Sequence, residues 1–279
     1  MNDYGTVHLK DEKFNPAQSR EMQLLIKVGS DRMSYAIVNE RDNRLMVLYD
    51  SALTQSVEDA IGDLLSENDY IRSSFSKIKV AVQTLNFTFI PQQYYTRDDL
   101  PGYEKIIQAQ EETKTFVSDV NDHSVKSVVA LELKTIAPLI SAFSEVKLMS
   151  QAEPVIEGNL KTRELKSKRL FLQFNSDSFE ACLCNEDKFI FYNVFSTGNA
   201  DDFNYYLLML MEQLSIDGAG TSAILAGNIS ANDELHNRVA KYFQHVRFAD
   251  CSELTALSPV FDDLPKHRHF SLISLLLCG

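Results

Sequence analysis

Apolar and polar residues follow the same order in two distant stretches of the chain, residues 25–40 and 171–186. Each stretch has an apolar run, a polar turn, a second apolar run and a second polar turn. The polar pairs align without a gap: Ser30-Asp31 with Ser176-Asp177, and Asn39-Glu40 with Asn185-Glu186. Alternating apolar positions are typical of strands with one buried face. The shared register therefore predicts two copies of one unit, produced by internal duplication.

The same patterns predict the elements of each half. In the first half we expect strands at residues 23–28, 33–38, 45–49, 77–82 and 146–149, apolar segments at 87–91 and 124–133, and helices at 57–65, 103–114, 135–143 and 152–165. In the second half we expect strands at 170–174, 179–184, 189–195, 221–226 and 246–248, and helices at 203–214, 235–243 and 270–277. Apolar residues three and four positions apart mark the clearest helices. Polar residues can cap two of them: Thr54 or Ser56 for the first, and Ser230 for the helix at 235–243. Residues 1–20 are polar and predict an extended lead-in.

A short charged run, Lys166-Ser167-Lys168-Arg169, comes directly before the second copy. It is the natural place for a domain boundary, so we expect a first lobe over residues 1–166 and a second over residues 167–279. A chain of 279 residues is long enough for two domains of ordinary size. Its 44% hydrophobic content is enough to fill two cores.

The net charge narrows the range of partners. The chain has 39 acidic and 27 basic residues, for a formal charge of −12. Nucleic-acid binding normally needs a clustered basic surface, so a nucleic-acid partner is disfavoured. The first residues contain no apolar signal region, and no apolar stretch approaches the roughly 20 residues that span a bilayer. We therefore expect a cytoplasmic protein without a transmembrane segment.

Cys182 and Cys184 point to the same face of a predicted strand, because they are two residues apart. They are either half of a metal site or two small buried hydrophobic side chains. No other His or Cys pair has ligand spacing, which favours the second interpretation and predicts no metal centre. The four cysteines show no disulfide-framework spacing, which fits a reducing compartment.

Each half is predicted to run as three antiparallel strands, helix, strand, helix, strand and helix, an order that resembles the ribonuclease-H-like unit. Two such units in tandem resemble the actin-like ATPase superfamily, which has an α/β fold. Three motifs carry a closer resemblance, to a family of uncharacterised Bacteroidetes proteins with this fold: Phe87-Thr88-Phe89-Ile90-Pro91, Asp202-Phe203-Asn204-Tyr205-Tyr206-Leu207-Leu208 and Leu225-Ala226-Gly227-Asn228-Ile229. These motifs are structural, so the resemblance implies a fold more than an activity.

The resemblance also marks the positions at which the superfamily binds nucleotide. The first hairpin of each lobe carries an Asp-x-Gly-x-Thr/Ser pattern there. The carboxylate holds Mg²⁺, and the glycine lets backbone N–H groups approach phosphate oxygens. The matching residues are Lys27, Gly29 and Ser30 in the first half and Gln173, Asn175 and Ser176 in the second. An ammonium group thus replaces the first carboxylate, and the second half lacks both the carboxylate and the glycine.

Two further features bear on nucleotide binding. The adenosine-binding turn of the superfamily usually holds two glycines, and the matching turn here is Ala226-Gly227-Asn228. Asp31 and Asp177 lie four residues beyond the missing carboxylates, so they could approach an inter-domain cleft and hold a metal jointly. The alternative, which we favour, is ordinary turn chemistry, in which a carboxylate accepts hydrogen bonds from turn N–H groups.

The sequence therefore favours a non-catalytic actin-like protein, with no resident cofactor and no catalytic residue, that acts as a cytoplasmic interaction or scaffold module for an unknown protein partner. No nucleophile elbow, phosphate loop or zinc-protease motif is present. One alternative is a divergent ATPase or phosphotransferase that uses Mg-ATP with Lys27, Gly29, Asp31 and Asp177. Another is a membrane-associated adaptor that docks through residues 270–277, a segment that we otherwise predict to be a buried helix.

Overall fold

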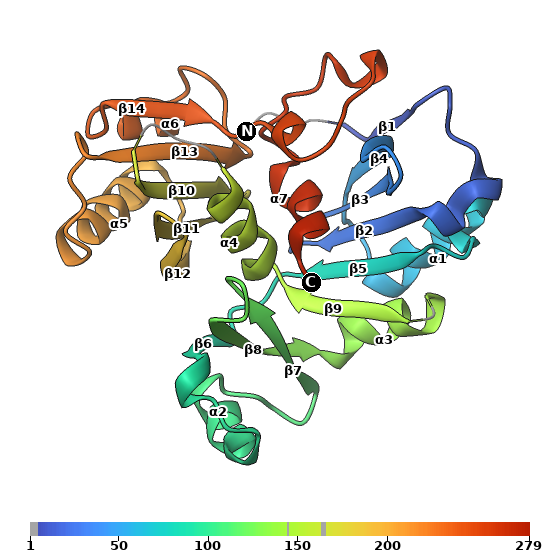
Figure 1. Ribbon diagram of the computed structural model, residues 1–279, viewed down its shortest axis with the longest axis horizontal. Coiled ribbons are helices and arrows are strands. Elements are labelled where there is room, and N and C mark those ends of the chain that lie inside the picture. Colours follow the sequence, from blue (N-terminus) through green and yellow to red (C-terminus); the bar gives the residue numbers. More distant parts are fainter. Residues whose placement is uncertain (1–4, 144, 163–165) are drawn as a thin grey trace. The chain divides into compact units, whose positions relative to one another are not determined.

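The computed structural model describes residues 5–143, 145–162 and 166–279, and these form two compact units (Figure 1). The first unit contains the described residues up to Glu153, together with Leu254–Leu264 and Cys278–Gly279. The second contains Pro154–Glu253 and Pro265–Leu277. Each unit is built on a mixed sheet whose shared strands have the same order. This confirms the predicted α/β fold of two ribonuclease-H-like units.

The main sheet of the first unit has six strands in the order β1-β4-β3-β2-β5-β9. Their bounds are Val7–Lys10 (β1), Met22–Val28 (β2), Arg32–Asn39 (β3), Arg44–Ala52 (β4), Lys77–Val82 (β5) and Val146–Ser150 (β9). Strands β2, β3 and β4 form the predicted antiparallel meander, and β5 and β9 extend the sheet parallel to β2. Strand β1 lies in the predicted lead-in and pairs with β4. A strand of only four residues gives too little alternation to be recognised in the sequence.

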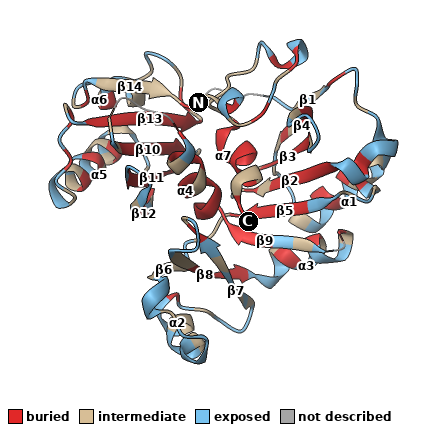
Figure 2. Cartoon of the chain, viewed as in Figure 1, coloured by how far each residue is buried: buried red, intermediate tan, exposed pale blue. Residues whose placement is uncertain are grey.

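Helices α1 (Val57–Glu67) and α3 (Leu133–Ala142) share one hydrophobic core with this sheet. Apolar residues at helical spacing on α1, such as Ile61 and Leu64, are buried there. Ser56 caps α1, because its hydroxyl oxygen accepts a hydrogen bond from the N–H of Asp59. Figure 2 shows that buried residues dominate the central strands. Each apolar side chain buried in this way contributes roughly 1.5–3 kcal/mol.

A three-stranded sheet in the order β6-β8-β7 is inserted between β5 and α3. Its elements are Phe87–Pro91 (β6), Leu100–Ile106 (α2), Thr113–Val120 (β7) and Val125–Glu132 (β8). The predicted helix over residues 103–114 is therefore wrong in extent, since α2 ends at Ile106 and a strand begins at Thr113. Threonine and valine recur along β7, and such β-branched residues favour strands.

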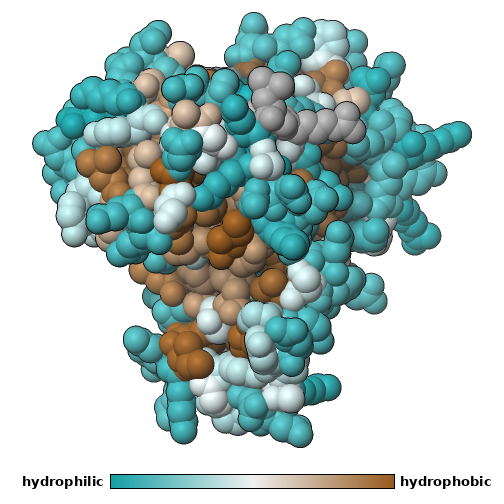
Figure 3. All heavy atoms as spheres, turned by 60° about the vertical axis from the view of Figure 1, so that its left-hand side comes forward, coloured by the Kyte–Doolittle hydropathy of each residue, from teal (hydrophilic) through white to brown (hydrophobic). Residues whose placement is uncertain are grey.

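The inserted sheet and the segments around it expose several large hydrophobic side chains. Leu85, Tyr94, Ile106 and Val117 are 65%, 69%, 66% and 38% exposed. Figure 3 shows brown hydrophobic atoms at the surface in the lower part of the view, which is the part of the chain that Figure 1 labels β6, β7, β8 and α2. Single exposed apolar residues are ordinary on protein surfaces, so these side chains alone define no site.

The sheet of the second unit has five strands in the order β12-β11-β10-β13-β14. Its strands are Lys168–Phe174 (β10), Ser178–Asn185 (β11), Lys188–Ser196 (β12), Thr221–Gly227 (β13) and His245–Phe248 (β14). Its helices are Ala152–Lys161 (α4), Ala200–Gln213 (α5), Glu234–Ala240 (α6) and Phe270–Ile273 (α7). Helices α5 and α6 share a hydrophobic core with one face of the sheet. The predicted helix over residues 152–165 ends at Lys161, and its last predicted residues, 163–165, lie outside the described residues.

Short 3₁₀ helices complete the connections between these elements. They are Pro16–Glu21, Asp69–Arg72, Gln92–Tyr94, Arg97–Asp99, Cys251–Glu253, Pro259–Phe261 and Ser274–Leu277. Several begin with a polar residue or a proline, which favours a turn over a continued strand.

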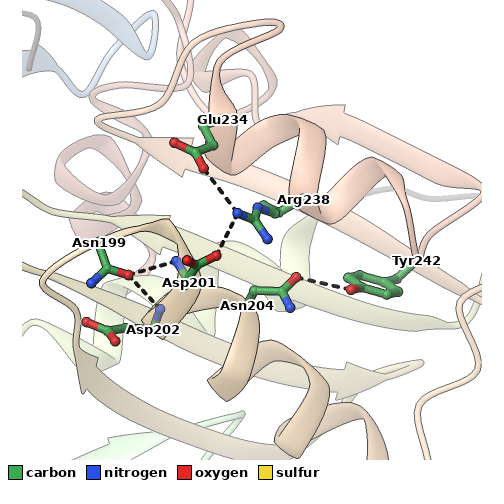
Figure 4. Close-up of polar contacts among 7 residues, drawn as sticks. All are labelled: Asn199, Asp201, Asp202, Asn204, Glu234, Arg238 and Tyr242. Atoms are coloured by element: carbon green, nitrogen blue, oxygen red, sulfur yellow. Dashed lines mark hydrogen bonds and ion pairs between the residues drawn. The ribbon is translucent and has the colours of Figure 1, made fainter.

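Helices α5 and α6 are joined at the surface by polar side chains (Figure 4). Arg238 of α6 contacts Asp201 of α5 at 2.7 Å and Glu234 of its own helix at 3.1 Å. Asn199 caps α5, since its side-chain oxygen accepts from two backbone N–H groups of the first turn. The predicted cap of the next helix is corrected: Asp233 caps α6, and Ser230 lies before it.

The chain passes from the first unit to the second within α4, between Glu153 and Pro154, and not between residues 166 and 167. The reason is packing: Asn159 of α4 donates a hydrogen bond to the backbone oxygen of Cys182 on β11. The charged run at 166–169 instead leads directly into β10. Residues Leu254–Leu264 also belong to the first unit. Within them, the N–H of Ala256 donates to the backbone oxygen of Asn43, and its oxygen accepts from the N–H of Leu45.

The apolar segment at 270–277 is buried, as predicted. Phe270, Ile273 and Leu275 are all 0% exposed. The ring of Phe270 lies 5.3 Å from the ring of Phe171 on β10, and α7 approaches α4 closely at Gly158. The membrane-adaptor hypothesis thus loses the apolar surface on which it rested. In the part of the chain that the structure describes, no helix is long and apolar enough to cross a bilayer.

Glu153, at the start of α4, is a buried carboxyl group that is 2% exposed. Its oxygens accept hydrogen bonds from the hydroxyls of Ser118 on β7 (2.6 Å) and Ser150 on β9 (2.9 Å). Burial raises the pKa of Glu153 above its ordinary value of 4.5, although the serine hydroxyls act in the opposite direction. Glu153 therefore ties the inserted sheet to the main sheet and favours its protonated form.

We expect Glu153→Gln to make the protein less sensitive to rising pH. In the wild type, Glu153 ionises at a lower pH in the unfolded state than in the folded state. The stabilisation from Glu153 is thus fully present below pH 4.5 and is lost as the pH rises through the raised folded value. Urea unfolding at a series of pH values from 4.5 upward should show the variant gaining stability relative to the wild type as the pH increases. Glu132→Gln, at an exposed carboxylate, should run parallel to the wild type; a parallel Glu153→Gln curve would contradict the assignment.

Candidate nucleotide-binding turns

The first candidate turn, Gly29–Asp31, connects β2 to β3 and uses its own N–H groups internally. The N–H of Gly29 donates to the backbone oxygen of Arg32 at 2.8 Å, and the N–H of Ser30 donates to the side-chain oxygen of Gln83 at 3.0 Å. Gln83 directly follows β5. Two backbone donors at this turn are therefore already engaged within the first unit.

The second candidate turn, residues 175–177, connects β10 to β11 and repeats this pattern. The N–H of Asn175 donates to the backbone oxygen of Ser178 at 2.9 Å. The backbone oxygen of Asp177 accepts from the N–H of Thr197 at 2.9 Å, just as that of Asp31 accepts from Leu53 at 2.7 Å. Gly29 and Asn175 thus occupy equivalent hydrogen-bonding positions in the two units, and so do Asp31 and Asp177.

Lys27 occupies the strand position at which the superfamily pattern has a carboxylate. Register places Lys27 opposite Ser34 and Ser34 opposite Asp50, so the three side chains form a row on one face of the sheet. Asp50 is 4% exposed and accepts two hydrogen bonds from the Arg32 guanidinium, both at 3.0 Å. The Arg32 guanidinium thus holds the carboxylate of this row through a bidentate pair.

Gln173 holds the equivalent position in the second unit and is 2% exposed. It pairs in register with Glu180 on β11, whose buried carboxylate accepts from Tyr192 at 2.7 Å and from Asn175 at 3.2 Å. The side-chain oxygen of Gln173 has no hydrogen-bond partner among the described residues. A buried amide and a hydrogen-bonded carboxylate therefore lie beneath the second turn.

Gly227, in the turn that matches the adenosine site, has a positive φ of 82°. A Cβ atom there would lie 2.1 Å from the backbone oxygen of Phe174 and 2.3 Å from the side-chain nitrogen of Gln173. The N–H of Asn228 donates to the same Phe174 oxygen at 2.9 Å. Glycine is thus required here by the close approach of β10 to β13 and by its backbone conformation.

The two candidate metal-binding aspartates belong to different units, Asp31 to the first and Asp177 to the second. Across residues 5–143, 145–162 and 166–279, no group of three or more His, Cys, Asp or Glu side chains is arranged to hold a metal ion. Cys182 and Cys184 are both buried, and their sulfur atoms are 3.9 Å apart. Burial raises the pKa of the Cys182 thiol, so this cysteine behaves as the predicted buried hydrophobic residue.

Sequence patterns did not identify three residues that lie beside the candidate turns: Gln83, Asp50 and Glu180. Strand alternation could have found Glu180, because it shares a face with Cys182 and Cys184, which were predicted to be buried. Asp50 lies on the opposite face from Tyr49 at the end of β4, so alternation alone did not identify it. Gln83 carries no local signal, because its contact with Ser30 joins residues far apart in the chain.

The repeated strand order and the equivalent hairpin turns define an actin-like ATPase fold. The chain belongs to the family described as "Protein of unknown function (DUF3822)", which matches residues 11–246. This confirms the resemblance to uncharacterised proteins with this fold. A comparison with curated protein sequences gives no match.

Solved structures agree on the fold. A Bacteroides thetaiotaomicron VPI-5482 protein with an actin-like ATPase fold and unknown function is 20% identical, with a TM-score of 0.78 over 95% of this chain and 99% of its own. A chain of the PilM-PilN type IV pilus biogenesis complex is 13% identical, with a TM-score of 0.68 over 92% and 98%. The ethanolamine utilization protein EutJ from Carboxydothermus hydrogenoformans is 8% identical, with a TM-score of 0.52 over 97% and 93%. At these identities the likeness concerns the fold alone.

Proposed function

We propose that this protein is a non-catalytic member of the actin-like ATPase fold that binds a protein partner and does not hydrolyse nucleotide. The observation that carries the proposal is the chemistry of the first turn. A bound Mg²⁺-nucleotide needs a carboxylate for the metal and available N–H groups for the phosphates. Lys27 replaces the carboxylate, and the N–H groups of Gly29 and Ser30 donate within the chain.

The second turn supports the same proposal. Gln173 and Asn175 replace the carboxylate and the glycine, and the N–H of Asn175 donates to Ser178. Gly227 is explained by strand packing, without a ligand. The residues present at these turns therefore do not fit Mg²⁺-nucleotide.

A role in protein interaction is supported by the fold relative in the PilM-PilN complex, in which a chain of this fold is part of a pilus biogenesis assembly. By analogy, this chain would use the fold as a rigid platform for a partner. The equivalent turns support an origin of the two units by internal duplication. Four free, buried cysteines fit a reducing compartment, so we propose a cytoplasmic location.

Isothermal titration with Mg-ATP, together with a phosphate-release assay, tests the proposal. We expect neither micromolar binding nor turnover, because a cation at Lys27 repels Mg²⁺ and the turn donors are engaged. Micromolar affinity accompanied by turnover would overturn the proposal in favour of the divergent ATPase.

Variants then identify the residues responsible for any weak binding. The divergent ATPase requires Asp31→Ala and Asp177→Ala each to reduce nucleotide affinity or hydrolysis. Asp187→Ala, in the exposed turn between β11 and β12, is the matched control and should have no effect. Equal behaviour of all three variants would exclude a role for Asp31 and Asp177 in nucleotide binding.

A further inference from the structure

A cavity of about 520 Å³ lies in the first unit, at the amino ends of β5 and β9. The loops that precede these strands line it, residues 72–76 before β5 and Glu145 before β9. Its volume falls in the range of about 300–1,000 Å³ that is typical of small-molecule sites. The turns discussed above follow the carboxyl end of β2, which is parallel to β5, so the cavity belongs to the opposite end of the sheet.

The lining of this cavity is strongly basic. Arg72, Lys77, Lys79 and Lys147 contribute four positive charges, and Glu145 is the acidic residue among the lining residues. Lys77 also lies 3.5 Å from Glu40, which offsets part of its charge. A local excess of cations is unusual in a chain with a formal charge of −12. Such an excess favours a negatively charged ligand.

Strand register concentrates three of these charges on one face of the sheet. Lys79 on β5 is the direct partner of Lys147 on β9, and Lys77 is two residues before Lys79 on the same face. Like charges placed directly opposite each other destabilise a sheet. A bound anion would relieve this repulsion.

Lys79 is the central residue of the group, because it is only 6% exposed. Its ammonium group donates to the backbone oxygen of Cys278 at 2.5 Å, which fixes the end of the side chain. Burial lowers the pKa of Lys79. The neighbouring Cys278 and Glu40 raise this pKa, and the charges of Lys77 and Lys147 lower it. A buried, positioned ammonium group has less to lose on binding an anion than a flexible surface lysine.

We propose that this cavity binds a small molecule through a phosphate group held by Lys79 and Lys147. Lysine binds phosphate as a compact point charge, and charge-assisted hydrogen bonds are about twice as strong as neutral ones. Ser73 and Ser74 also line the cavity, and a serine hydroxyl can donate to a phosphate oxygen. The site is independent of the candidate nucleotide turns, so it stands whether or not they bind Mg-ATP.

Isothermal titration of the full chain with inorganic pyrophosphate tests the site, at an ionic strength held constant with sodium chloride. We expect saturable binding that is weakened at least about tenfold by Lys147→Ala and by Lys79→Met. Lys188→Ala, at the exposed start of β12, is the matched control and should bind like the wild type. Because Lys147 is exposed, its variant tests the site even if Lys79→Met fails to fold.

Three results would overturn the proposal: no saturable binding at millimolar pyrophosphate, an affinity unchanged in Lys147→Ala, or an equal loss in Lys188→Ala. A parallel titration with malonate distinguishes a phosphate site from a carboxylate site. Malonate binding tighter than pyrophosphate binding would replace the phosphate assignment.

Discussion

Replacing Gly227 with alanine is expected to destabilise the protein by about 3 kcal/mol or more. A positive φ costs an L-residue roughly 1–2 kcal/mol. The new Cβ would also lie 2.1 Å from the backbone oxygen of Phe174, and a backbone atom in a paired strand has little freedom to move. Urea unfolding monitored by circular dichroism measures the loss as a shift of the transition midpoint.

Gly62→Ala is the matched control for this experiment. Gly62 lies in the exposed interior of α1, and a Cβ atom added there would have no neighbouring atom within 4 Å. Alanine at this position should therefore stabilise the protein by about 0.5–1 kcal/mol. If Gly227→Ala left the stability unchanged, strand packing would not explain this glycine, and the ligand interpretation would regain support.

Asp50→Asn is expected to cost about 2 kcal/mol in the free energy of unfolding. The change removes the charge that Arg32 contacts through two hydrogen bonds, in a row of the sheet that also contains Lys27. Asp50 is almost fully buried, so water replaces the lost interaction poorly. The Arg32 side chain is 25% exposed, which keeps the cost below that of a fully buried pair. Urea unfolding at neutral pH measures it.

Asp42→Asn provides the comparison, because Asp42 pairs with Arg44 at the surface with its side chain 54% exposed. Exposed ion pairs contribute about 0–1 kcal/mol, so this variant should lose less than about 0.5 kcal/mol. Equal losses in the two variants would show that the largely buried Arg32–Asp50 pair stabilises the protein no more than an exposed ion pair.

Gly227 lies in the turn that matches the adenosine site, and Asp50 lies in the row of the first sheet that contains Lys27. In this chain, Gly227 holds two strands together and Asp50 holds a guanidinium group. Both residues therefore make contacts that stabilise the fold beside the candidate turns. Such contacts support the proposal that the fold is retained for partner binding without catalysis.

Much of the fold could be predicted from the sequence because its signals are local. The meander of β2, β3 and β4, and its counterpart β10, β11 and β12, follow from alternating apolar residues separated by polar turns. The apolar stripes of α1 and α5 follow from helical spacing. The predicted helix over residues 103–114 overlaps the start of β7, because the polar loop before this strand shows neither helical nor strand periodicity.

The candidate turns themselves were also predictable, since a polar pair at fixed spacing after an apolar strand is visible in the chain. Their chemistry was only partly predictable. Lys27 and Gln173 could be recognised as replacements of a carboxylate, but the contacts of Gln83 and Asp50 join residues from different strands. The cation cluster of the cavity likewise depends on the pairing of β5 with β9.

The sequence by itself determined the repeated order of strands and helices and the presence of Lys27 and Gln173, which are not carboxylates, before the two turns, because each depends on residues close together in the chain. The tertiary structure alone decided which groups occupy the turn donors, why Gly227 must be glycine and where Lys79 meets Lys147. These depend on the register and close approach of strands that are distant in sequence, and local hydrophobic patterning specifies neither.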